Sequence, residues 1–339
     1  MSYDFYRQVS SADDISLTKL IDLASGKNVD VNVEGSSGDG NLLFLKTTNP
    51  LKVKALIRIG CHVNFKNTRE KATPIFFQED PDVIKELINA GAKANHLNYA
   101  KQNALFFATN VESLKLLHEA GAKINQIDKW GKNITFYLKD PEMLQYAISQ
   151  GLNINLIDKD GRNALFDSDI IKNVNMVKEL INNNIDIEYC KDRILVQAVM
   201  YNSPKQVLSM LIKHGANIYG EDEYGNTMFF HINKLEKLHT VFMSNPHPVD
   251  LGYTLKSGKT VLEQLRYDFH VIDLFESDMF TNDMLLSPYK GGKLIEKISQ
   301  IYSSRHGQIN PKIEIIAQKL LLNDLIKSPD NTNKTTQRL

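Results

Sequence analysis

One phrase recurs along this chain and constrains its fold more than any other feature. Residues 151–166 read GLNINLIDKDGRNALF, residues 121–136 read GAKINQIDKWGKNITF, and residues 91–106 read GAKANHLNYAKQNALF. The residues that end the successive copies are Phe44, Phe76, Phe106, Phe136, Phe166, Val196, Phe230 and Glu263. The copies are therefore 30 to 34 residues apart. Such a period indicates supersecondary units that stack on one another, each burying its apolar face against the next.

Two linked motifs in these copies resemble one known family. The tetrapeptides that end them read NLLF, TPIF, NALF, NITF, NALF, RILV, TMFF and TVLE. The second, at residues 73–76, is nearly the TPLH signature of ankyrin repeats. The segments that precede the phrase, such as LINAGAKAN and LIKHGANIY, resemble the end of an ankyrin repeat. The chain is thus similar to the ankyrin-repeat family over about residues 14–265, in eight registers.

The resemblance implies an all-α fold, an ankyrin-repeat α-solenoid of about eight helix-turn-helix repeats with β-turn tips and helical caps. The Asn-rich, NALF-type copies are similar to repeats of ankyrin proteins from bacterial pathogens. Two departures from the family pattern predict structural differences. The central repeats are about three residues shorter than 33, and the loss precedes the outer helix, so we expect an inner helix of little over two turns. Phe replaces the family's His in most copies, which favours apolar packing between neighbouring repeats.

Capping residues predict where the two helices of a repeat begin. A side-chain carbonyl oxygen at an N-cap can accept a hydrogen bond from a free N–H of the first turn. For the inner helix, the expected caps are Asn103, Asn133 and Asn163. Proline at the first helical position loses no hydrogen bond and has its φ already set. For the outer helix, the expected cap and proline pairs are Asn49-Pro50, Asp80-Pro81, Asp140-Pro141 and Ser203-Pro204.

Glycines predict where the outer helices end, because a left-handed residue is needed there. These are Gly91, Gly121, Gly151 and Gly215. Outside the array, residues 1–24 predict an N-terminal capping helix that precedes repeats over residues 25–265. Residues 266–326 have helical apolar spacing and are expected to form a C-terminal cap or a small helical domain. Residues 327–339 are polar and expected to be disordered.

Composition argues against several classes of function. Lys plus Arg and Asp plus Glu number 40 each, so the neutral chain has no global attraction to nucleic acid or to an anionic membrane. No apolar run approaches the length of a membrane span, and the first residues contain no apolar stretch of a secretory signal. Two cysteines, Cys61 and Cys190, cannot make a disulfide framework. We therefore expect a cytoplasmic protein, or one exported to the cytosol of a host cell by machinery that uses other signals.

The sequence contains no recognisable catalytic or ligand-binding motif. The segment GYTLKSGKT at residues 252–260 has one residue too many for a phosphate-binding loop, and no strand precedes it. The eight-residue spacing of His231, His239 and His247 does not present a metal-binding face on one helix. We therefore expect no cofactor, no metal, no catalytic residue and no small-molecule substrate.

Function is then expected on the surface of the array. In ankyrin-repeat proteins the turn tips and inner helices line a concave face that binds partner proteins, so the resemblance implies a non-catalytic binding protein. Exposed Trp and Tyr are typical interface residues because they bring a large contact area at low entropic cost. The expected partner-binding residues are Tyr99, Lys129, Trp130, Lys132, Lys159, Asp160, Arg162, Tyr189, Glu223 and Tyr224. The four aromatic residues among them are predicted to form one row.

Three hypotheses for the function stay open from the sequence. The first is a protein that holds another protein on its concave face, in a bacterium or, as an exported effector, in a host cell. The second is an enzyme whose active site lies in the C-terminal helical segment. The third is an inhibitor that blocks a toxin or a host enzyme, which uses the same binding chemistry with a different partner.

Overall fold

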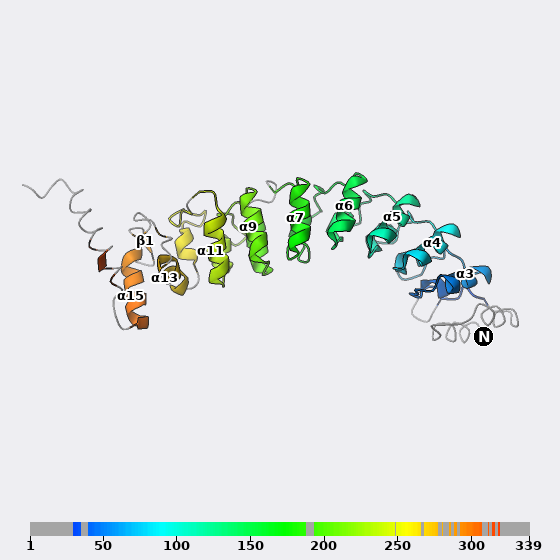
Figure 1. The fold of residues 1–339 in the computed structure, drawn as a ribbon, viewed down its shortest axis with the longest axis horizontal. Coiled ribbons are helices and arrows are strands. Elements are labelled where there is room, and N and C mark those ends of the chain that lie inside the picture. The colour runs from blue at the N-terminus through cyan, green and yellow to red at the C-terminus, as the bar shows by residue number, and fades with distance from the viewer. Residues whose placement is uncertain are drawn as a thin grey trace, which may run out of the picture. The chain divides into compact units, whose positions relative to one another are not determined.

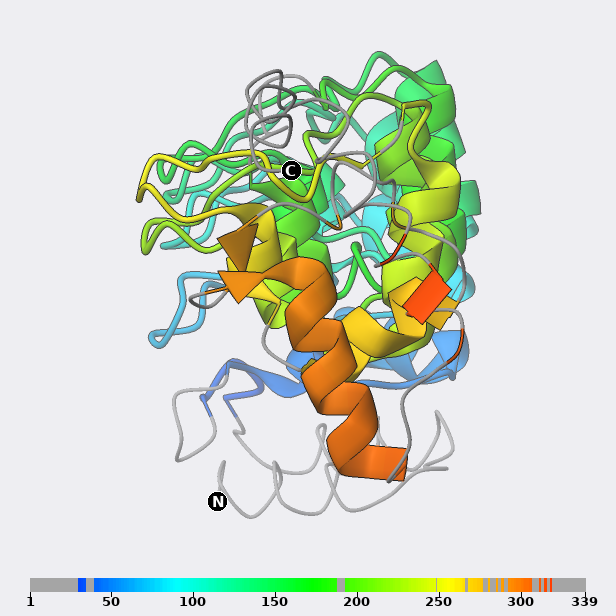
Figure 2. The same cartoon turned by 90° about the vertical axis from the view of Figure 1, so that its left-hand side faces the viewer.

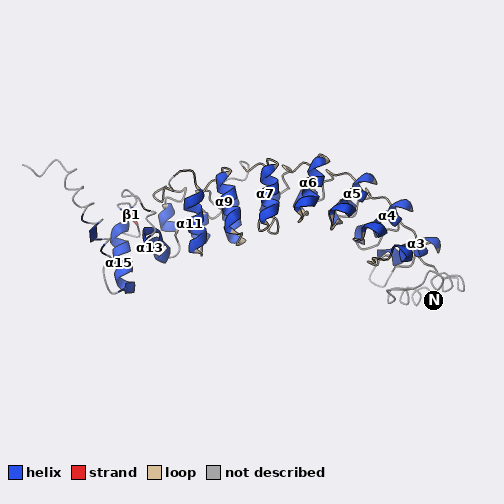
Figure 3. Ribbon diagram, viewed as in Figure 1, coloured by secondary structure: helices blue, strands red, loops and turns tan. Residues whose placement is uncertain are grey.

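Helices form almost all the regular structure of the described residues (Figure 3). The computed structural model describes residues 30–34, 40–187, 193–247, 249–265, 268–276, 280, 285, 288–289, 292–306, 311, 314–315 and 318. The chain forms two compact units, Met1–Ile185 and Asp186–Leu339, here called unit 1 and unit 2. The described strands are β1 (Pro288–Tyr289) and β2 (Gly292–Lys293), which pair antiparallel.

Unit 1 is a stack of helix pairs, each an inner 3-10 turn followed by an outer α-helix (Figure 1). The inner turns are η1 (Leu42–Phe44), η2 (Pro74–Phe77), η3 (Ala104–Phe107), η4 (Ile134–Phe136) and η5 (Ala164–Phe166). The outer helices are α3 (Pro50–Arg58), α4 (Pro81–Asn89), α5 (Val111–Glu119), α6 (Pro141–Ser149) and α7 (Val174–Asn182). Each outer helix packs against the next one, so the outer helices of unit 1 form a continuous layer.

The predicted caps of the inner elements are confirmed. In Asn103, Asn133 and Asn163, the side-chain oxygen accepts from the backbone N–H two residues later, at 3.1, 3.1 and 3.2 Å. The capped turn then buries apolar residues such as Leu165, which is 0% exposed. The asparagine therefore fixes the start of the turn while the apolar residues provide its packing energy.

The outer helices of unit 1 also begin and end as predicted. Proline is the first residue of α3, α4 and α6, and Asn49, Asp80 and Asp140 before it accept hydrogen bonds from the first turn. The glycines expected at the helix ends have positive φ angles of 88°, 91° and 83° in Gly91, Gly121 and Gly151 of unit 1, and of 93° in Gly215 of unit 2. Asn184 takes this conformation after α7, with a φ of 61°, as its short polar side chain allows.

One predicted helix start is wrong. Helix α9 (Lys205–Lys213) begins after Pro204, which occupies the cap position itself, and Ser203 does not cap it. The backbone N–H of Ser203 donates to the carbonyl of Ala198 at 2.9 Å, which ties this residue to the preceding helix. Its hydroxyl is buried and has no hydrogen-bond partner among the described residues.

The inner elements of unit 1 are shorter than predicted. Each is a single 3-10 turn of three or four residues instead of little over two helical turns. After η3, Ala108 already has extended backbone angles (φ −63°, ψ 132°), and Asn110 caps the outer helix α5. Because only Ala108 and Thr109 lie between η3 and that cap, the chain has no length for a second turn.

Phenylalanines pack between neighbouring repeats, as the sequence predicted. The Phe that ends one copy of the motif contacts an aromatic ring in the next repeat, at the position after its tetrapeptide. The pairs are Phe44–Phe77, Phe76–Phe107 and Phe106–Tyr137, with ring centroids 5.3, 5.4 and 5.3 Å apart. Such pairs contribute about 0.5–1.5 kcal/mol each beyond the burial of their area.

Asparagines in loops of unit 1 make a second link between repeats. The Nδ2 of Asn125 donates to the carbonyl of Gly151 at 2.8 Å, and its Oδ1 accepts from the N–H of Asn153 at 2.8 Å. Asn32 and Asn64 make the same two bonds to the repeats that follow them. We call this pair of bonds the asparagine clamp. It joins one repeat to the backbone of the next and accounts for part of the chain's richness in asparagine.

Unit 2 is also built of helix pairs, with α-helices in both positions. The inner helices are α8 (Ile194–Met200), α10 (Met228–His231) and α12 (Val261–Gln264). The outer helices are α9, α11 (Leu235–Ser244) and α13 (Asp268–Glu276), and α15 (Leu294–His306) follows them. Eight inner–outer pairs therefore lie in the described part of the chain, five in unit 1 and three in unit 2.

The helices described in the C-terminal segment, whose role the sequence left open, are α13 and α15. Helix α13 packs against α11 and α15, and it buries Val271, Ile272 and Leu274. Residues 1–24 and 327–339 lie outside the described residues. The division of the chain into caps, array and tail stays a prediction. No described helix combines the length and apolarity that a bilayer span needs.

Candidate functional site

Each repeat of unit 1 projects a turn, here called its tip, on the side away from its outer helix (Figure 2). The tips discussed below are residues 66–71, 97–102, 127–132 and 157–162. Backbone hydrogen bonds join each tip to the one before it. The N–H groups of Tyr99, Lys129 and Lys159 donate to Glu70, Ala100 and Trp130, at 2.8, 2.8 and 3.0 Å. The tips therefore lie side by side.

A buried aspartate holds the shape of the third tip. Asp128 is 3% exposed, and its Oδ1 accepts from the N–H groups of Trp130 and Lys132, both at 2.9 Å. Gly131 has a φ of 85°, and a Cβ there would lie 3.0 Å from the backbone nitrogen of Lys159. The turn thus needs glycine both for its conformation and for its approach to the next tip. Trp130 is presented on a rigid loop.

Tyr137 fixes this tip to the inner turn behind it. Its hydroxyl donates to Oδ2 of Asp128 at 2.6 Å. Burial and this hydrogen bond raise the pKa of Tyr137 above its ordinary value, so the hydroxyl stays a donor at neutral pH. Sequence analysis did not single out Tyr137 or Phe107, which hold the same position in adjacent repeats. The recurrence of an aromatic residue directly after the tetrapeptide is the signal that could have found them.

The two aromatic residues predicted on these tips are exposed. Tyr99 is 62% exposed and Trp130 is 47% exposed. A lysine lies over each ring: Lys71 Nζ is 5.9 Å from the ring centroid of Tyr99, and Lys129 Nζ is 4.3 Å from that of Trp130. Cation–π contacts of this kind contribute about 0.5–1 kcal/mol at exposed sites, so they orient the rings without burying them.

The charged residues predicted at the site lie on the same tips. Lys132 Nζ is 3.9 Å from Asp158 Oδ2 and 5.3 Å from the ring centroid of Phe136. Arg162 pairs with Asp160 and lies 3.4 Å from the same oxygen of Asp158. Exposed ion pairs contribute about 0–1 kcal/mol, so the stability of the tips depends more on the buried aspartates than on these pairs.

The structure gathers seven of the ten predicted residues on the tips of unit 1: Tyr99, Lys129, Trp130, Lys132, Lys159, Asp160 and Arg162. Glu223 and Tyr224 belong to a tip of unit 2, where both are exposed. Tyr189 lies outside the described residues. The predicted single row is therefore seen in unit 1 for two aromatic residues, Tyr99 and Trp130, which lie on adjacent tips.

Comparison with known proteins identifies the repeats. A family model described as ankyrin repeats, in three copies, matches residues 134–222. Residues 134–222 therefore contain ankyrin repeats. The crystal structure of the ankyrin repeat domain of Bcl-3, a member of the IkappaB protein family, is similar at 18% sequence identity and a TM-score of 0.41, covering 70% of this chain and 96% of that one. No curated protein matches the sequence.

The predicted all-α ankyrin-repeat solenoid is thus confirmed in its repeat type and in its helix-turn-helix units. Ankyrin repeats are a protein–protein interaction module, and this supports a protein-binding role for the chain. Their fold is a non-catalytic scaffold, in which surface residues change without altering the core.

The tip of unit 2 that carries Tyr224 is also held by an aspartate, but a histidine replaces the tyrosine that contacts its second oxygen. Oδ1 of Asp222 accepts from the N–H groups of Tyr224 and Asn226, both at 2.9 Å, and Oδ2 lies 3.1 Å from His231 Nε2. Burial alone would raise the pKa of Asp222, but hydrogen bonds from Asn226, His231 and Tyr224 hold it below its ordinary value. His231 occupies the position that Tyr137 has in unit 1.

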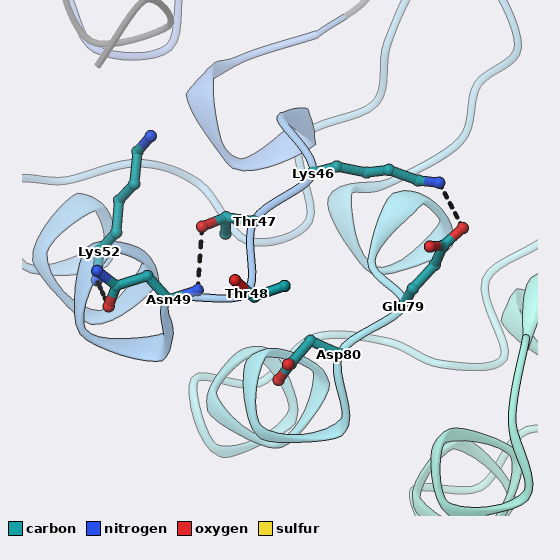
Figure 4. A pocket seen from close by; sticks show the side chains of 7 residues that line it. All are labelled: Lys46, Thr47, Thr48, Asn49, Lys52, Glu79 and Asp80. Carbon is teal, nitrogen blue, oxygen red and sulfur yellow. Dashed lines mark hydrogen bonds and ion pairs between the residues drawn. The ribbon is translucent and has the colours of Figure 1, made fainter. Parts of the chain in front are cut away.

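A polar cavity of about 300 Å³ lies in unit 1 beside the N-termini of the outer helices α3 and α4 (Figure 4). Its walls are Lys46, Thr47, Thr48, Asn49, Lys52, Glu79 and Asp80. The side chains of Asn49 and Asp80 already cap α3 and α4, and Lys46 pairs with Glu79. These groups stabilise the repeats themselves, and we assign the cavity no ligand.

The described part of the array shows little that could support chemistry. No group of three His, Cys, Asp or Glu side chains that could hold a metal is found among the described residues. Cys61 is buried, and its Sγ lies 3.6 Å from the carbonyl of Val31. Burial, with the nearby charge of Asp30, raises the pKa of this thiol to about 12. The thiol is therefore protonated at neutral pH and unreactive.

Proposed function

We propose that this chain binds a partner protein through the tips and inner turns of unit 1. The observation that carries the proposal is the pair Tyr99 and Trp130, two exposed aromatic residues on adjacent tips that are joined by backbone hydrogen bonds. Trp130 is the single tryptophan of the chain and is about half exposed. Large aromatic residues at the centre of an interface are often hot spots, whose replacement by alanine costs about 2 kcal/mol or more of binding free energy.

The rigidity of the tips favours this role. A loop that must order on binding loses conformational entropy, which lowers the affinity. Here Asp128, Tyr137 and the bonds between tips hold Trp130 in place before any partner arrives. The inner turns add the ring of Phe107, which is 37% exposed, so that a partner could contact the tips and this ring together.

Unit 2 offers further contacts of its own. Tyr224 is 80% exposed on a tip with the same aspartate-based geometry, and the exposed Glu223 precedes it. We include both residues in the proposal as a separate contact surface on unit 2. Tyr189 stays a predicted contact from the sequence.

A pull-down from bacterial and from host-cell lysates tests this function. The bait proteins are the wild type, a double variant with Tyr99→Ala and Trp130→Ala, and a control with Leu51→Ala. Leu51 is 67% exposed on the outer helix α3, so its loss removes a large apolar side chain from another face of the same unit. We expect a protein that the wild type and the control retain and the double variant loses. Equal retention by all three would contradict the proposal.

We further propose that the chain acts in the cytosol of a host cell as an exported bacterial effector. The similarity of its NALF-type repeats to those of ankyrin proteins from bacterial pathogens supports this place of action. The test is a fusion to a reporter enzyme that is active only in host cytosol, produced in the bacterium during infection. Reporter activity in host cells would support export, and its absence in a strain that makes the fusion normally would contradict it.

A further inference from the structure

The tips of unit 1 are rich in positive charge, although the chain as a whole is neutral. The basic row, as we call it, comprises Lys71, Lys101, Lys129, Lys132, Lys159 and Arg162. Four acidic residues stand on the same tips, but two of them, Asp128 and Asp158, are only 3% and 6% exposed. The negative charge at the surface of this row comes from Glu70 and Asp160.

The buried aspartates do not neutralise most of the row. Oδ1 of Asp128 and Oδ1 of Asp158 each accept two backbone hydrogen bonds within their own tips. Lys132 and Arg162 lie near Asp158, at 3.9 and 3.4 Å. By contrast, none of the ion pairs in the described part of the chain involves Lys101, Lys129 or Lys159.

Aromatic rings lie among these cations. Lys71 and Lys129 approach the rings of Tyr99 and Trp130, and the exposed part of Phe107 belongs to the inner turn behind the tip of Tyr99. The surface therefore combines positive charge with apolar contact area. Complementary charge on a partner would increase its rate of association and exclude basic competitors, while contact with the rings would slow dissociation.

We propose that the partner presents an acidic segment of protein, with carboxylates opposite the basic row and an apolar side chain against Trp130. This inference rests on the proposed function and names the chemistry of the partner. A protein segment suits the row better than a nucleic acid does. A nucleic acid backbone carries a charge at every nucleotide, and Glu70 and Asp160 would repel it, whereas a protein segment can place neutral residues there.

The emission of Trp130 provides a direct readout, because it reports only this site. The acidic probe is a synthetic peptide of three Glu-Glu-Phe-Glu units. The matched probe has Lys in place of every Glu, and an oligothymidine about twenty nucleotides long tests the other class of anion. We expect the acidic peptide to shift the emission and the lysine peptide to leave it unchanged. The affinity should fall as salt rises from about 50 to 200 mM, because surface charges are then screened.

Charge reversal tests the row itself. In a double variant with Lys101→Glu and Lys159→Glu, the acidic peptide should bind at least about tenfold more weakly, on the order of 1.4 kcal/mol. The same two positions changed to Arg should retain binding, since the charge is kept. The control carries Lys85→Glu and Lys178→Glu, which reverse two exposed lysines on the outer helices α4 and α7. Thermal unfolding of each variant checks that the fold is kept.

Three outcomes would overturn the inference. They are equal binding of the lysine peptide, tighter binding of the oligothymidine than of the acidic peptide, and no salt-sensitive binding of the acidic peptide at all. The pull-down tests the proposed function separately. A natural partner that depends on Tyr99 and Trp130, but is still retained by the Lys101→Glu, Lys159→Glu variant, would keep the function and reject the acidic segment.

Discussion

Units 1 and 2 join neighbouring repeats through different side chains at the same place in the repeat. In unit 1, Oδ1 of Asn125 accepts from the N–H of Asn153 at 2.8 Å. In unit 2, Tyr219 holds the corresponding position, three residues before the tip aspartate, and its hydroxyl accepts from the N–H of Asp250 at 2.7 Å. The backbone donor is the constant part of this joint. Any side chain that brings an oxygen to it can complete the bond.

The inner elements differ for a reason of chain length. Phe106 and Phe136 in unit 1 are 30 residues apart, and a single 3-10 turn fills the inner position. Val196 and Phe230 in unit 2 are 34 residues apart, and the seven-residue helix α8 fits there. The inner element of this 30-residue repeat therefore forms fewer helical backbone hydrogen bonds than α8 does. In unit 1 the aromatic pairs and the asparagine clamp supply other contacts across the interface.

The largest expected effect tests whether both kinds of inner element bury the same position. Leu165 in unit 1 and Leu195 in unit 2 each lie two residues after the start of the tetrapeptide, and they are 0% and 1% exposed. Leu→Ala at either residue should lower the free energy of unfolding by about 2–5 kcal/mol, because it leaves a cavity. Chemical denaturation measures this. A loss below about 1 kcal/mol at Leu165 would contradict the assigned repeat register.

A second expected effect compares the two tips. Trp130 and Tyr224 each follow the tip aspartate by two residues. We expect Trp130→Ala to weaken binding of the partner by about 2 kcal/mol or more and to change the stability by only about 0.5 kcal/mol. For Tyr224→Ala we expect a loss of binding of about 1 kcal/mol or less. Titration calorimetry with the captured partner measures both, and the reverse order would place the main contact on unit 2.

The joint between repeats gives the third effect. Asn125→Ala removes both bonds of one clamp and should destabilise unit 1 by about 1–2 kcal/mol. Tyr219→Phe removes the single bond of its hydroxyl in unit 2 and should cost about 0.5–1.5 kcal/mol, while the stacking on Tyr253, at 4.4 Å between centroids, remains. Equilibrium unfolding of both variants measures the difference. If Tyr219→Phe lowered the free energy of unfolding more than Asn125→Ala does, the single bond of the tyrosine hydroxyl would stabilise its joint more than the two bonds of the clamp stabilise theirs.

The smallest effect is a dependence on pH. The pKa of Asp222 lies below its ordinary value of 3.8, so its ionised form stabilises unit 2 above that pH, and this contribution is lost as the pH falls through the folded-state value. The stability difference between the wild type and Asp222→Asn should therefore shrink as the pH falls from neutral toward 3. We expect less than about 1 kcal/mol in total. Glu223→Gln, on the exposed neighbour, is the matched control, and a difference that grows on acidification would contradict the assignment.

Much of this architecture could be predicted because the residues that start and end the helices recur in successive repeats. Caps such as Asn103 and glycines such as Gly121 act within a few residues, so the sequence alone locates them. The length of the inner element was overestimated, since helical periodicity does not show where Asn110 would start the next helix. At Ser203, a good capping residue was outweighed by the contact of its backbone with the preceding helix.

The candidate site was predictable in its most exposed residues and not in its supports. Tip positions such as Trp130 follow from the register of the repeat. The bond from Tyr137 to Asp128 and the charge of the basic row depend on which tips lie side by side, which a single repeat does not reveal. Tyr224 belongs to unit 2, whereas Tyr99 and Trp130 belong to unit 1. The regular spacing of the motifs does not predict this division.

The asparagine clamp makes successive repeats interchangeable. In the following repeat, Asn125 forms hydrogen bonds to a carbonyl and an N–H of the main chain, so these two bonds do not depend on the side chains of its neighbour. A gene duplication or deletion that adds or removes one whole repeat of unit 1 would leave the bonds of the remaining clamps intact. The array can thus lengthen or shorten in whole-repeat steps during evolution, and each new copy adds a tip whose sequence is free to diverge.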